Sequence, residues 1–464
     1  MNNIIGNHVG GSRVNQTGGT LQDVFNPSTG GVSSQVRLSS ASELDEVVKV
    51  ASAAVPAWAA TPPSKRAQVL YRFKRLLEEN ADKIASAISS EHGKTHDDAL
   101  GEVGRGLEAV EFSCGIPQLL KGTFSEQVAT SIDVYSIPQP LGVVAGITPF
   151  NFPAMVPIWM FPNALACGNA FILKPSERDP SVTLILADLL KEAGLPDGVF
   201  NVVQGDKVVV DAILDNPEIM AVSFVGSTPV AEYIYTRGAS NGKRVQALGG
   251  AKNHMIIMPD ADMNLAVDAL MGAGYGSAGE RCMAISVPVP VGEKVADELM
   301  DRMIPLVEKL PVGPPEDSNA AMGPVITKQS LDRITALLQS GVDQGAKLLV
   351  DGRGLKVPGH ENGFFIGGSL FDQVTPEMDI YKEEIFGPVL STVRVADYEE
   401  AIKLVHGNPY ANGVAIFTRD GDAARDFVNR IQVGMVGINV PIPVPVGYHS
   451  FGGWKKSIFG SHHI

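Results

Sequence analysis

The sequence predicts an α/β protein in which a parallel, doubly wound sheet is followed by a second α/β domain. Three observations predict it. The 464 residues exceed the size of one compact domain. Between residues 142 and 225, short apolar runs alternate with amphipathic stretches, as strands and helices of a parallel sheet do. The same alternation resumes at about residue 251 and indicates the second domain.

The first 120 residues predict short strands and then three helices. Residues 1–40 are polar and glycine-rich, and their apolar residues at 24, 25, 32 and 36 mark strand positions. Ser42 can cap a helix over 43–58. Apolar residues recur at helical spacing over 64–90 and again over 97–120, so each of these segments predicts one long helix.

The next segment, residues 123–139, spreads apolar side chains through polar ones, which is typical of a hairpin at a sheet edge or a subunit contact. Strands are then predicted over 142–147, 170–174, 199–203 and 221–225, with helices over 155–167, 181–193 and 207–215. The turn Gly226-Ser227-Thr228 follows the last of these strands. It can present N–H groups and a hydroxyl to phosphate, or simply cap a helix.

The second domain predicts the same kinds of element. Its expected strands cover 255–258, 286–291, 414–417 and 435–439, and its expected helices cover 263–274, 294–310, 329–344, 398–406 and 423–431. No strand or helix is expected after the turn Phe451-Gly452-Gly453, so the C-terminus looks truncated.

Composition excludes several classes of function. The net charge of −14 disfavours a nucleic-acid partner and an anionic membrane surface. No apolar run is long enough to span a bilayer, and no secretory signal is visible. The three cysteines, Cys114, Cys167 and Cys282, form no disulfide framework and no zinc-ligand spacing, so no metal site is predicted. A cytoplasmic location fits, as does a mitochondrial matrix after removal of a presequence.

One cysteine has the surroundings of a nucleophile. Cys282 follows Arg281 at the end of Gly276-Ser277-Ala278-Gly279-Glu280. Small residues let a substrate approach the backbone, and an adjacent cation favours thiolate over thiol. The alternative is a buried, inert cysteine, which is how most free cysteines behave.

Six motifs together resemble the aldehyde dehydrogenase superfamily, and the resemblance covers essentially the whole chain. They are Pro149-Phe150-Asn151-Phe152-Pro153, Lys174-Pro175-Ser176-Glu177, Gly226-Ser227-Thr228, Leu248-Gly249-Gly250, the Cys282 stretch, and Glu383-Glu384-Ile385-Phe386-Gly387-Pro388. Three further stretches resemble its CoA-acylating branch, the methylmalonate-semialdehyde dehydrogenases: Gly250-Ala251-Lys252-Asn253-His254, Arg281-Cys282-Met283-Ala284 and Phe451-Gly452-Gly453-Trp454-Lys455.

The resemblance implies a domain organisation. A Rossmann-type NAD-binding domain would consist of residues 1–122 and 141–250, and a catalytic domain of residues 251–440. Residues 123–140 and 441–464 would form a small β element that joins subunits, so a homo-oligomer, a dimer or tetramer, is expected.

The resemblance also implies the chemistry. The Cys282 thiolate attacks an aldehyde, and the Asn151 side-chain amide and the Cys282 N–H stabilise the oxyanion. Hydride transfer to NAD leaves a thioester. Hydrolytic members carry a glutamate before Leu-Gly-Gly, but this chain has Ala247, so CoA is the expected acceptor. Another carboxylate that activates water remains the alternative.

Cofactor and substrate residues follow from the same matches. Lys174 and Glu177 resemble the pair that binds the adenosine ribose, which favours NAD over NADP, although an exposed ion pair is an alternative. The other matched positions that line the cofactor are Thr148, Phe150, Arg178, Ser227, Gly249, Glu384 and Phe386.

Arg105 and Arg281 are candidates for binding a substrate carboxylate, because a guanidinium suits bidentate pairing. Arg105 could instead lie on a solvated helix face, and Arg281 could instead lower the pKa of the thiol.

The predicted function is NAD-dependent oxidation of malonate or methylmalonate semialdehyde with transfer to CoA, giving acetyl-CoA or propionyl-CoA. One alternative is a hydrolytic dehydrogenase of another small aldehyde. The other is an inactive scaffold or binding protein, against which Asn151, Cys282 and Glu384 argue.

Overall fold

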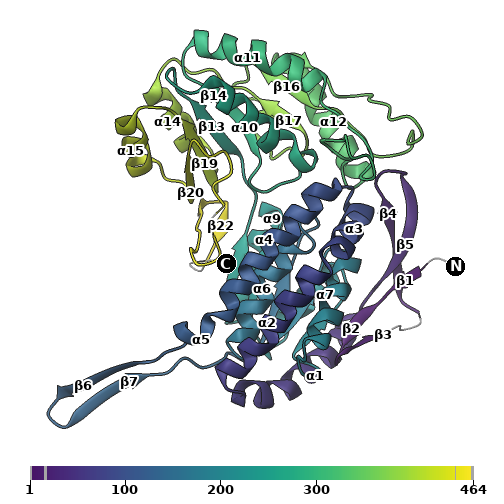
Figure 1. The fold of residues 1–464 in the computed structure, drawn as a ribbon, viewed down its shortest axis with the longest axis vertical. Coiled ribbons are helices and arrows are strands. Elements are labelled where there is room, and N and C mark those ends of the chain that lie inside the picture. Colours follow the sequence, from purple (N-terminus) through teal and green to yellow (C-terminus); the bar gives the residue numbers. More distant parts are fainter. Residues whose placement is uncertain (1–2, 15–17, 445, 461–464) are drawn as a thin grey trace.

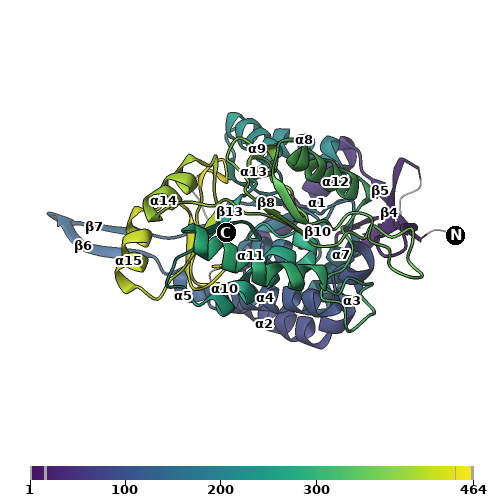
Figure 2. The ribbon, with the colours of Figure 1, turned by 90° about the horizontal axis from the view of Figure 1, so that it is seen from above.

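The protein forms two α/β domains beside each other, with a long hairpin projecting from one of them (Figure 1). The computed structural model describes residues 3–14, 18–444 and 446–460. The lower domain in this view carries the N-terminal helices, and the upper domain is built from the chain beyond residue 250. Seen from above, the hairpin and the N-terminal strands point away in opposite directions (Figure 2). No helix among the described residues is long and apolar enough to cross a membrane.

The first domain is organised around an eight-stranded sheet in the order β22-β12-β11-β8-β9-β10-β2-β3. Its five parallel strands are β8 (Val143–Ile147), β9 (Ala170–Lys174), β10 (Phe200–Val202), β11 (Ile219–Val225) and β12 (Arg244–Leu248). Antiparallel strands extend both edges: β2 (Asn7–Val9), β3 (Ser12–Val14) and β22 (Ile458–Phe459). The predicted strands and their parallel arrangement are therefore confirmed.

Side chains of the central strands alternate between two apolar cores, because successive residues of a strand point to opposite faces. Phe171 and Leu173 of β9 face one core, whereas Ala170 and Ile172 face the other. The first core also contains side chains of α2 (Pro63–Glu79), α3 (Ala81–His92), α4 (His96–Cys114), α6 (Met155–Ala166) and α7 (Ser181–Glu192). The second contains side chains of α1 (Ala41–Ala60), α8 (Lys207–Asp215) and α9 (Thr228–Ser240).

Two helices predicted as continuous are each divided. The segment 64–90 is interrupted at Asn80, whose φ of −112° and ψ of 14° separate α2 from α3. The segment 97–120 ends α4 at Gly115 and continues as the short α5 (Ile116–Leu119). Pro117 explains the second break, since proline cannot donate the backbone hydrogen bond that would continue α4.

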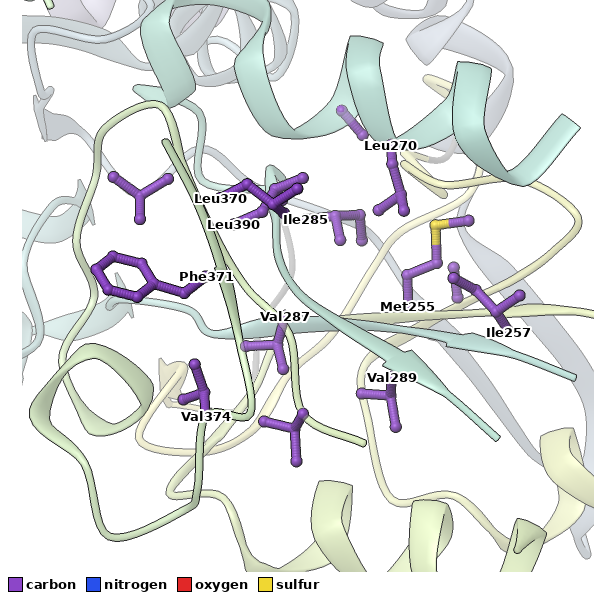
Figure 3. Close-up of a cluster of buried hydrophobic side chains, with 14 of the residues drawn as sticks. Met255, Ile257, Leu270, Ile285, Val287, Val289, Leu370, Phe371, Val374 and Leu390 are labelled. Carbon is purple, nitrogen blue, oxygen red and sulfur yellow. The ribbon is translucent and has the colours of Figure 1, made fainter. Parts of the chain in front are cut away.

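The second domain contains a parallel sheet in the order β14-β13-β19-β20 and a smaller sheet in the order β15-β16-β17. The strands are β13 (Asn253–Ile257), β14 (Ile285–Pro290), β19 (Gly413–Phe417), β20 (Met435–Ile438), β15 (Lys347–Val350), β16 (Ser369–Asp372) and β17 (Val389–Ser391). The helices are α10 (Met263–Tyr275), α11 (Glu293–Glu308), α12 (Lys328–Asp343), α13 (Asp379–Lys382), α14 (Tyr398–Gly407) and α15 (Gly421–Arg430). Figure 3 shows the core between the sheets and α10.

The smaller sheet of this domain was not expected from the sequence. Its strands have only three or four residues each, which is too short for a periodic pattern to stand out.

Two smaller β elements belong to the first half of the chain. The strands β1 (Asn3–Ile5), β4 (Thr20–Asn26) and β5 (Gly31–Leu38) form a three-stranded sheet. The predicted hairpin is present as β6 (Thr123–Ala129) and β7 (Ile132–Ser136), which pair only with each other among the described strands. All residues of both hairpin strands are exposed.

The expectation that no strand follows residue 453 is wrong. Trp454–Lys455 forms β21, which pairs with β18 (Tyr410–Ala411), and β22 pairs antiparallel with β12 in the first sheet. Residues 458–459, which the sequence predicts in a small β element with the hairpin, are instead part of the sheet of the first domain. Their pairing depends on a strand more than 200 residues earlier, which no local pattern reveals. The last predicted residues, 461–464, lie outside the described part.

Candidate functional site

Predicted cofactor residues lie at the carboxyl ends of neighbouring parallel strands. Thr148 follows β8, Lys174 ends β9, Ser227 follows β11 and Gly249 follows β12. The chain runs outward from β8 through β9 to β10 and then returns to β11 on the other side of β8. Such a reversal opens a crevice at the carboxyl edge of a sheet, where doubly wound folds bind nucleotides.

The crevice has polar groups suited to a ribose or phosphate. Lys174 Nζ donates to Glu177 Oε2 at 2.9 Å. Burial favours the neutral acid of Glu177, but the charge and hydrogen bond of Lys174 outweigh it and hold the pKa of this carboxyl below its usual range. Thr148 Oγ1 is buried with no hydrogen-bond partner among the described residues, and a ligand could satisfy it. These groups fit a dinucleotide.

Contacts of the Phe150 ring connect the site in the first domain with Phe386 of the second domain. The Arg178 guanidinium lies 4.9 Å from the centre of the Phe150 ring. The Phe150 ring in turn meets the Phe386 ring edge-on, with centroids 5.7 Å apart. Phe386 adopts a left-handed φ of 55°, which a non-glycine residue rarely takes without a local constraint. The structure therefore brings the predicted residues of both domains together.

Cys282 lines a small cavity with Glu384 and Phe386. Its backbone oxygen accepts hydrogen bonds from Asn253 Nδ2 at 2.9 Å and from Asn412 Nδ2 at 3.3 Å. Two side-chain amides thus fix the peptide that carries the thiol.

The surroundings of Cys282 favour the thiol over the thiolate. Burial, followed by the nearby charge of Glu384, raises the pKa of Cys282 to about 11. This differs from the expectation that Arg281 favours the thiolate. The reason is that the Arg281 guanidinium turns to Asp98, with Nη2 and Oδ1 2.6 Å apart.

A backbone N–H binds the Glu384 carboxylate, and two basic side chains bind carbonyl groups of the segment around it. Its Oε1 accepts from the Ala251 N–H at 3.0 Å, and burial raises the pKa of the carboxyl. Lys252 Nζ donates to the carbonyls of Ile380 and Glu383 at 2.7 and 2.8 Å. Arg333 donates to the carbonyls of Glu384 and Ile385 at 2.6 and 2.7 Å. Lys252 and Arg333 together therefore hold the backbone of the segment around Glu384. Burial lowers the pKa of Lys252 to about 7.

Glycines allow this packing. A Cβ on Gly250 would lie 2.5 Å from Glu384 Oε2, and a Cβ on Gly249 would lie 2.7 Å from the carbonyl oxygen of Lys456. Larger residues at either position would displace the motif or the backbone. Ala247, two residues before Gly249, is buried in β12 and has only a methyl group as its side chain.

Asn151 is buried on a loop that a buried ion pair secures. Lys94 donates to the Asn151 carbonyl and to Glu102 Oε2, the latter at 2.7 Å. Glu102 Oε1 accepts from the N–H groups of Ala154 and Met155 at the start of α6. The charge of Lys94 also acts to lower the pKa of Cys282, so it lies near both predicted catalytic residues.

Arg105 lies outside the cavity of Cys282. It is on α4, half exposed, and its Nη1 is 3.5 Å from Glu108 Oε2, as the helix-face alternative predicts. It lines a larger cavity of about 210 Å³ together with residues of α4, residues of α6, and residues 444 and 446–451. The walls of this cavity include Trp159, His449 and Phe451.

Sequence reasoning missed the supporting side chains Lys94, Asp98, Glu102, Asn253, Arg333 and Asn412. Only Asn253 lies within a stretch that had drawn attention, the segment 250–254. The others are single polar residues in ordinary helices and loops, and their relation to the site depends on tertiary contacts. No cluster of potential metal ligands occurs among the described residues.

The fold and this pairing of a strand-end crevice with a cysteine are those of a dehydrogenase that acts on aldehydes. Residues 14–464 match the aldehyde dehydrogenase family, and the chain belongs to that family. It is 62% identical over 445 residues to a malonate-semialdehyde dehydrogenase of Pseudomonas aeruginosa, covering 96% of this chain and 90% of the relative. It is 49% identical over 454 residues to the mitochondrial, acylating methylmalonate-semialdehyde dehydrogenase of Arabidopsis thaliana, covering 98% and 74%.

Solved structures agree with these relatives. A structure assigned to a methylmalonate-semialdehyde dehydrogenase of Sinorhizobium meliloti, complexed with NAD, is 61% identical with a TM-score of 0.99, covering 100% of this chain and 94% of that one. A second, from Oceanimonas doudoroffii, is 58% identical with a TM-score of 0.98 and the same coverage. The predicted superfamily and fold class are confirmed.

Proposed function

We propose that the protein oxidises malonate or methylmalonate semialdehyde with NAD and transfers the acyl group to CoA, giving acetyl-CoA or propionyl-CoA. One observation carries the proposal: Cys282 shares a cavity with Glu384 and Phe386, whereas Ala247 offers no base for water. The names of the relatives and the NAD in a similar structure support it.

In the proposed reaction the Cys282 thiolate attacks the aldehyde carbon and forms a C–S bond. The Asn151 amide and the Cys282 N–H donate hydrogen bonds to the resulting oxyanion. NAD, when bound, supplies the acceptor for the hydride, and loss of that hydride leaves an acyl thioester on Cys282. The CoA thiol, after losing its proton, attacks this thioester, and Cys282 leaves as thiolate for the next turnover. The carboxyl group of the substrate leaves as CO2 before or during this release, so that the product is acetyl-CoA or propionyl-CoA.

The NAD-binding residues we propose come from both domains. Lys174 and Glu177 would hold the adenosine ribose, and Glu384 the nicotinamide ribose. Phe386 would pack beside the nicotinamide ring. The remaining positions that would line the dinucleotide are Thr148, Phe150, Arg178, Ser227 and Gly249.

Steady-state assays with malonate, methylmalonate and succinate semialdehydes, each with NAD and with or without CoA, test the proposal. CoA should accelerate NADH formation from the preferred substrate, because thioester release is otherwise slow. Mass spectrometry after omission of CoA should find an acyl adduct on Cys282. Turnover that is fast and indifferent to CoA would instead support hydrolysis, with Glu384, which lines the same cavity as Cys282, as the candidate base.

We further propose that Arg105 and Arg281 bind the carboxylate of the substrate. Each guanidinium now has a carboxylate partner, Glu108 and Asp98 respectively, so a substrate would have to compete with or share these partners. The variant Arg105→Lys should raise KM for a semialdehyde that carries a carboxylate much more than for a neutral aldehyde. Equal increases for the two substrates would reject the role.

We infer that the β6–β7 hairpin joins subunits into a homo-oligomer. Its apolar side chains are exposed, including Phe124 at 65% and Tyr135 at 71%, and these two residues pair across the strands. Such a surface on a free strand pair favours burial against another copy. In sedimentation velocity, the double variant Phe124→Glu with Tyr135→Glu should yield a smaller species than the wild type, while Thr130→Glu at the hairpin turn should not.

We also propose that the protein is a cytoplasmic enzyme, because its cysteines are free, as is usual in a reducing compartment.

A further inference from the structure

The turn that leads into Cys282 has an unfavourable backbone conformation. Ser277, Ala278 and Gly279 follow one another with φ values of 50°, 53° and 69°. Two of the three carry a Cβ, and the left-handed region costs such residues on the order of 1–3 kcal/mol. A run of this kind persists only where its surroundings determine it, and all three residues are buried.

The carboxylate of Asp98 makes several of the contacts that hold this turn. Asp98 Oδ2 accepts hydrogen bonds from both the backbone N–H and the hydroxyl of Ser277, each at 3.0 Å. Its Oδ1 accepts from Arg281 Nη2 at 2.6 Å, and Arg281 Nε also contacts Ser277 Oγ at 3.2 Å. Asp98 therefore contacts both ends of the turn, four residues apart and immediately before Cys282.

The position of Asp98 in its own helix supports a role outside that helix. It is the third residue of α4, and its N–H bonds to the cap residue Thr95 at 3.3 Å. An acidic residue at this position commonly turns back to the N–H of the cap residue. Here both carboxylate oxygens are taken up by residues of the second domain, so α4 and the turn are joined across the two domains.

We propose that Asp98 is a positioning residue, which holds the left-handed turn at Ser277–Gly279 and thereby the thiol of Cys282 and the guanidinium of Arg281. The ordinary alternative is a partly exposed ion pair, which contributes little to stability. The two hydrogen bonds to Ser277, one of them from the backbone, distinguish Asp98 from such a pair. The expected effect of Asp98 on turnover rests on the proposed function of Cys282. The expected effect of Asp98 on the conformation of the turn does not.

Three variants test the proposal. Asp98→Ala removes all three contacts. Asp98→Asn keeps an oxygen that can accept from Ser277 but loses the charge that pairs with Arg281. Asp97→Ala is the matched control, because Asp97 is an exposed acid in the same first turn of α4. Each is compared with wild type by hydrogen exchange of a peptide spanning residues 275–283 and by steady-state kinetics.

Asp98→Ala should speed exchange of this peptide and lower kcat by about tenfold each, the factor that corresponds to about 1.4 kcal/mol. The fall in kcat should be similar for a carboxylated and a neutral aldehyde, with KM for NAD unchanged. Asp98→Asn should recover most of the slow exchange, and Asp97→Ala should match wild type in both measurements.

Unchanged exchange in Asp98→Ala would overturn the proposal, as would equal effects of Asp97→Ala. A fall in kcat for the carboxylated aldehyde alone would also overturn it, because Asp98 would then act only through Arg281. Exchange is independent of the reaction. If the proposed function is wrong, wild type will show no activity with the semialdehydes while the exchange difference remains.

Discussion

The protonation state of Cys282 in the folded protein differs from the state that its sequence neighbours predict. Small neighbours and a cation suggested a ready thiolate, yet burial and the charge of Glu384 hold the pKa of the thiol at about 11. At neutral pH these surroundings therefore favour the thiol of Cys282 over the thiolate.

Alkylation measures this state directly. Because thiolate is the reactive form, the rate of iodoacetamide labelling at Cys282 should rise about tenfold per pH unit from pH 7 to 10 without a plateau. Glu384→Gln removes the second cause of the raised pKa and should accelerate labelling near pH 8. The exposed neighbour Glu383→Gln is the control and should not. Labelling at each cysteine is followed by peptide mass spectrometry, and a plateau below pH 9 would contradict the assigned pKa.

At the scale of elements, the site depends on two loops that touch through their backbones. The turn before Cys282 and the segment 383–388 meet where Gly279 faces Gly387. A Cβ on Gly279 would lie only 2.1 Å from the Gly387 carbonyl oxygen. The clamp formed by Lys252 and Arg333 prevents the second loop from giving way. Neither loop can therefore shift without moving the other.

The variant Gly279→Ala should consequently be costly. It combines a backbone clash with a φ of 69° that disfavours a side chain, so the free energy of unfolding should fall by about 1–3 kcal/mol. Turnover should fall by at least about tenfold, since a misplaced reacting group costs about that much or more. Gly272→Ala in α10 is the matched control, because its Cβ would meet nothing within 4 Å and the helix should gain stability. Denaturant unfolding and kcat measure both, and a Gly279→Ala protein as stable and active as wild type would refute the packing argument.

Much of this fold could be predicted from the sequence, for a physical reason. Buried parallel strands such as β8 and β9 are continuous apolar runs, and long amphipathic helices repeat their pattern several times. Breaks such as Asn80 have no comparable signal, because a single asparagine is also tolerated inside helices. The short strands β15 and β22 depend on distant partners rather than on their own residues.

The candidate site divides in the same way. Motifs indicated Asn151, Cys282 and Glu384, because each lies within a run of distinctive residues. The side chains that restrain these three residues could not be found from motifs, because they are distant in the sequence. Arg281 and Asp98 are 183 positions apart, and Lys94 and Asn151 are 57 apart. The sequence therefore suggested Arg281 as a free cation, whereas its nearest partner in the structure is an aspartate of the other domain.

For the whole molecule, the contact between the domains contains ionisable groups that burial keeps neutral. His92 Nε2 of α3 lies 3.8 Å from Glu280 Oε2, two residues before Cys282. Burial lowers the pKa of His92 well below its usual value and raises that of Glu280 to about 8, although Arg178 and Lys94 act to lower the latter. Both groups are then uncharged at neutral pH, and Glu280 Oε2 accepts from the Ile326 N–H at 3.2 Å.

Stability should therefore depend on pH through Glu280. The folded protein keeps this proton up to about pH 8, whereas the unfolded chain releases it near pH 4.5. Protonated Glu280 contributes fully to the free energy of unfolding below pH 4.5. This contribution is lost as pH rises toward 8, by on the order of 1 kcal/mol per pH unit. Glu280→Gln lacks this loss, so its Tm relative to wild type should be higher at pH 9 than at pH 6. The exposed Glu316→Gln should show no such trend, and a difference between Glu280→Gln and wild type that is constant with pH would reject the neutral acid.

The pairing of β22 with β12 makes the second domain an insertion between two adjacent strands of one sheet. Its two tethers leave and return side by side: Gly249 N–H donates to the Ser457 carbonyl, and Ser457 Oγ donates to the Gly250 carbonyl and accepts from the Ala411 N–H. Both covalent connections between the domains therefore lie side by side, and Ser457 is hydrogen-bonded next to each of them. If the two domains move relative to each other, we expect the hinge to lie at Ser457.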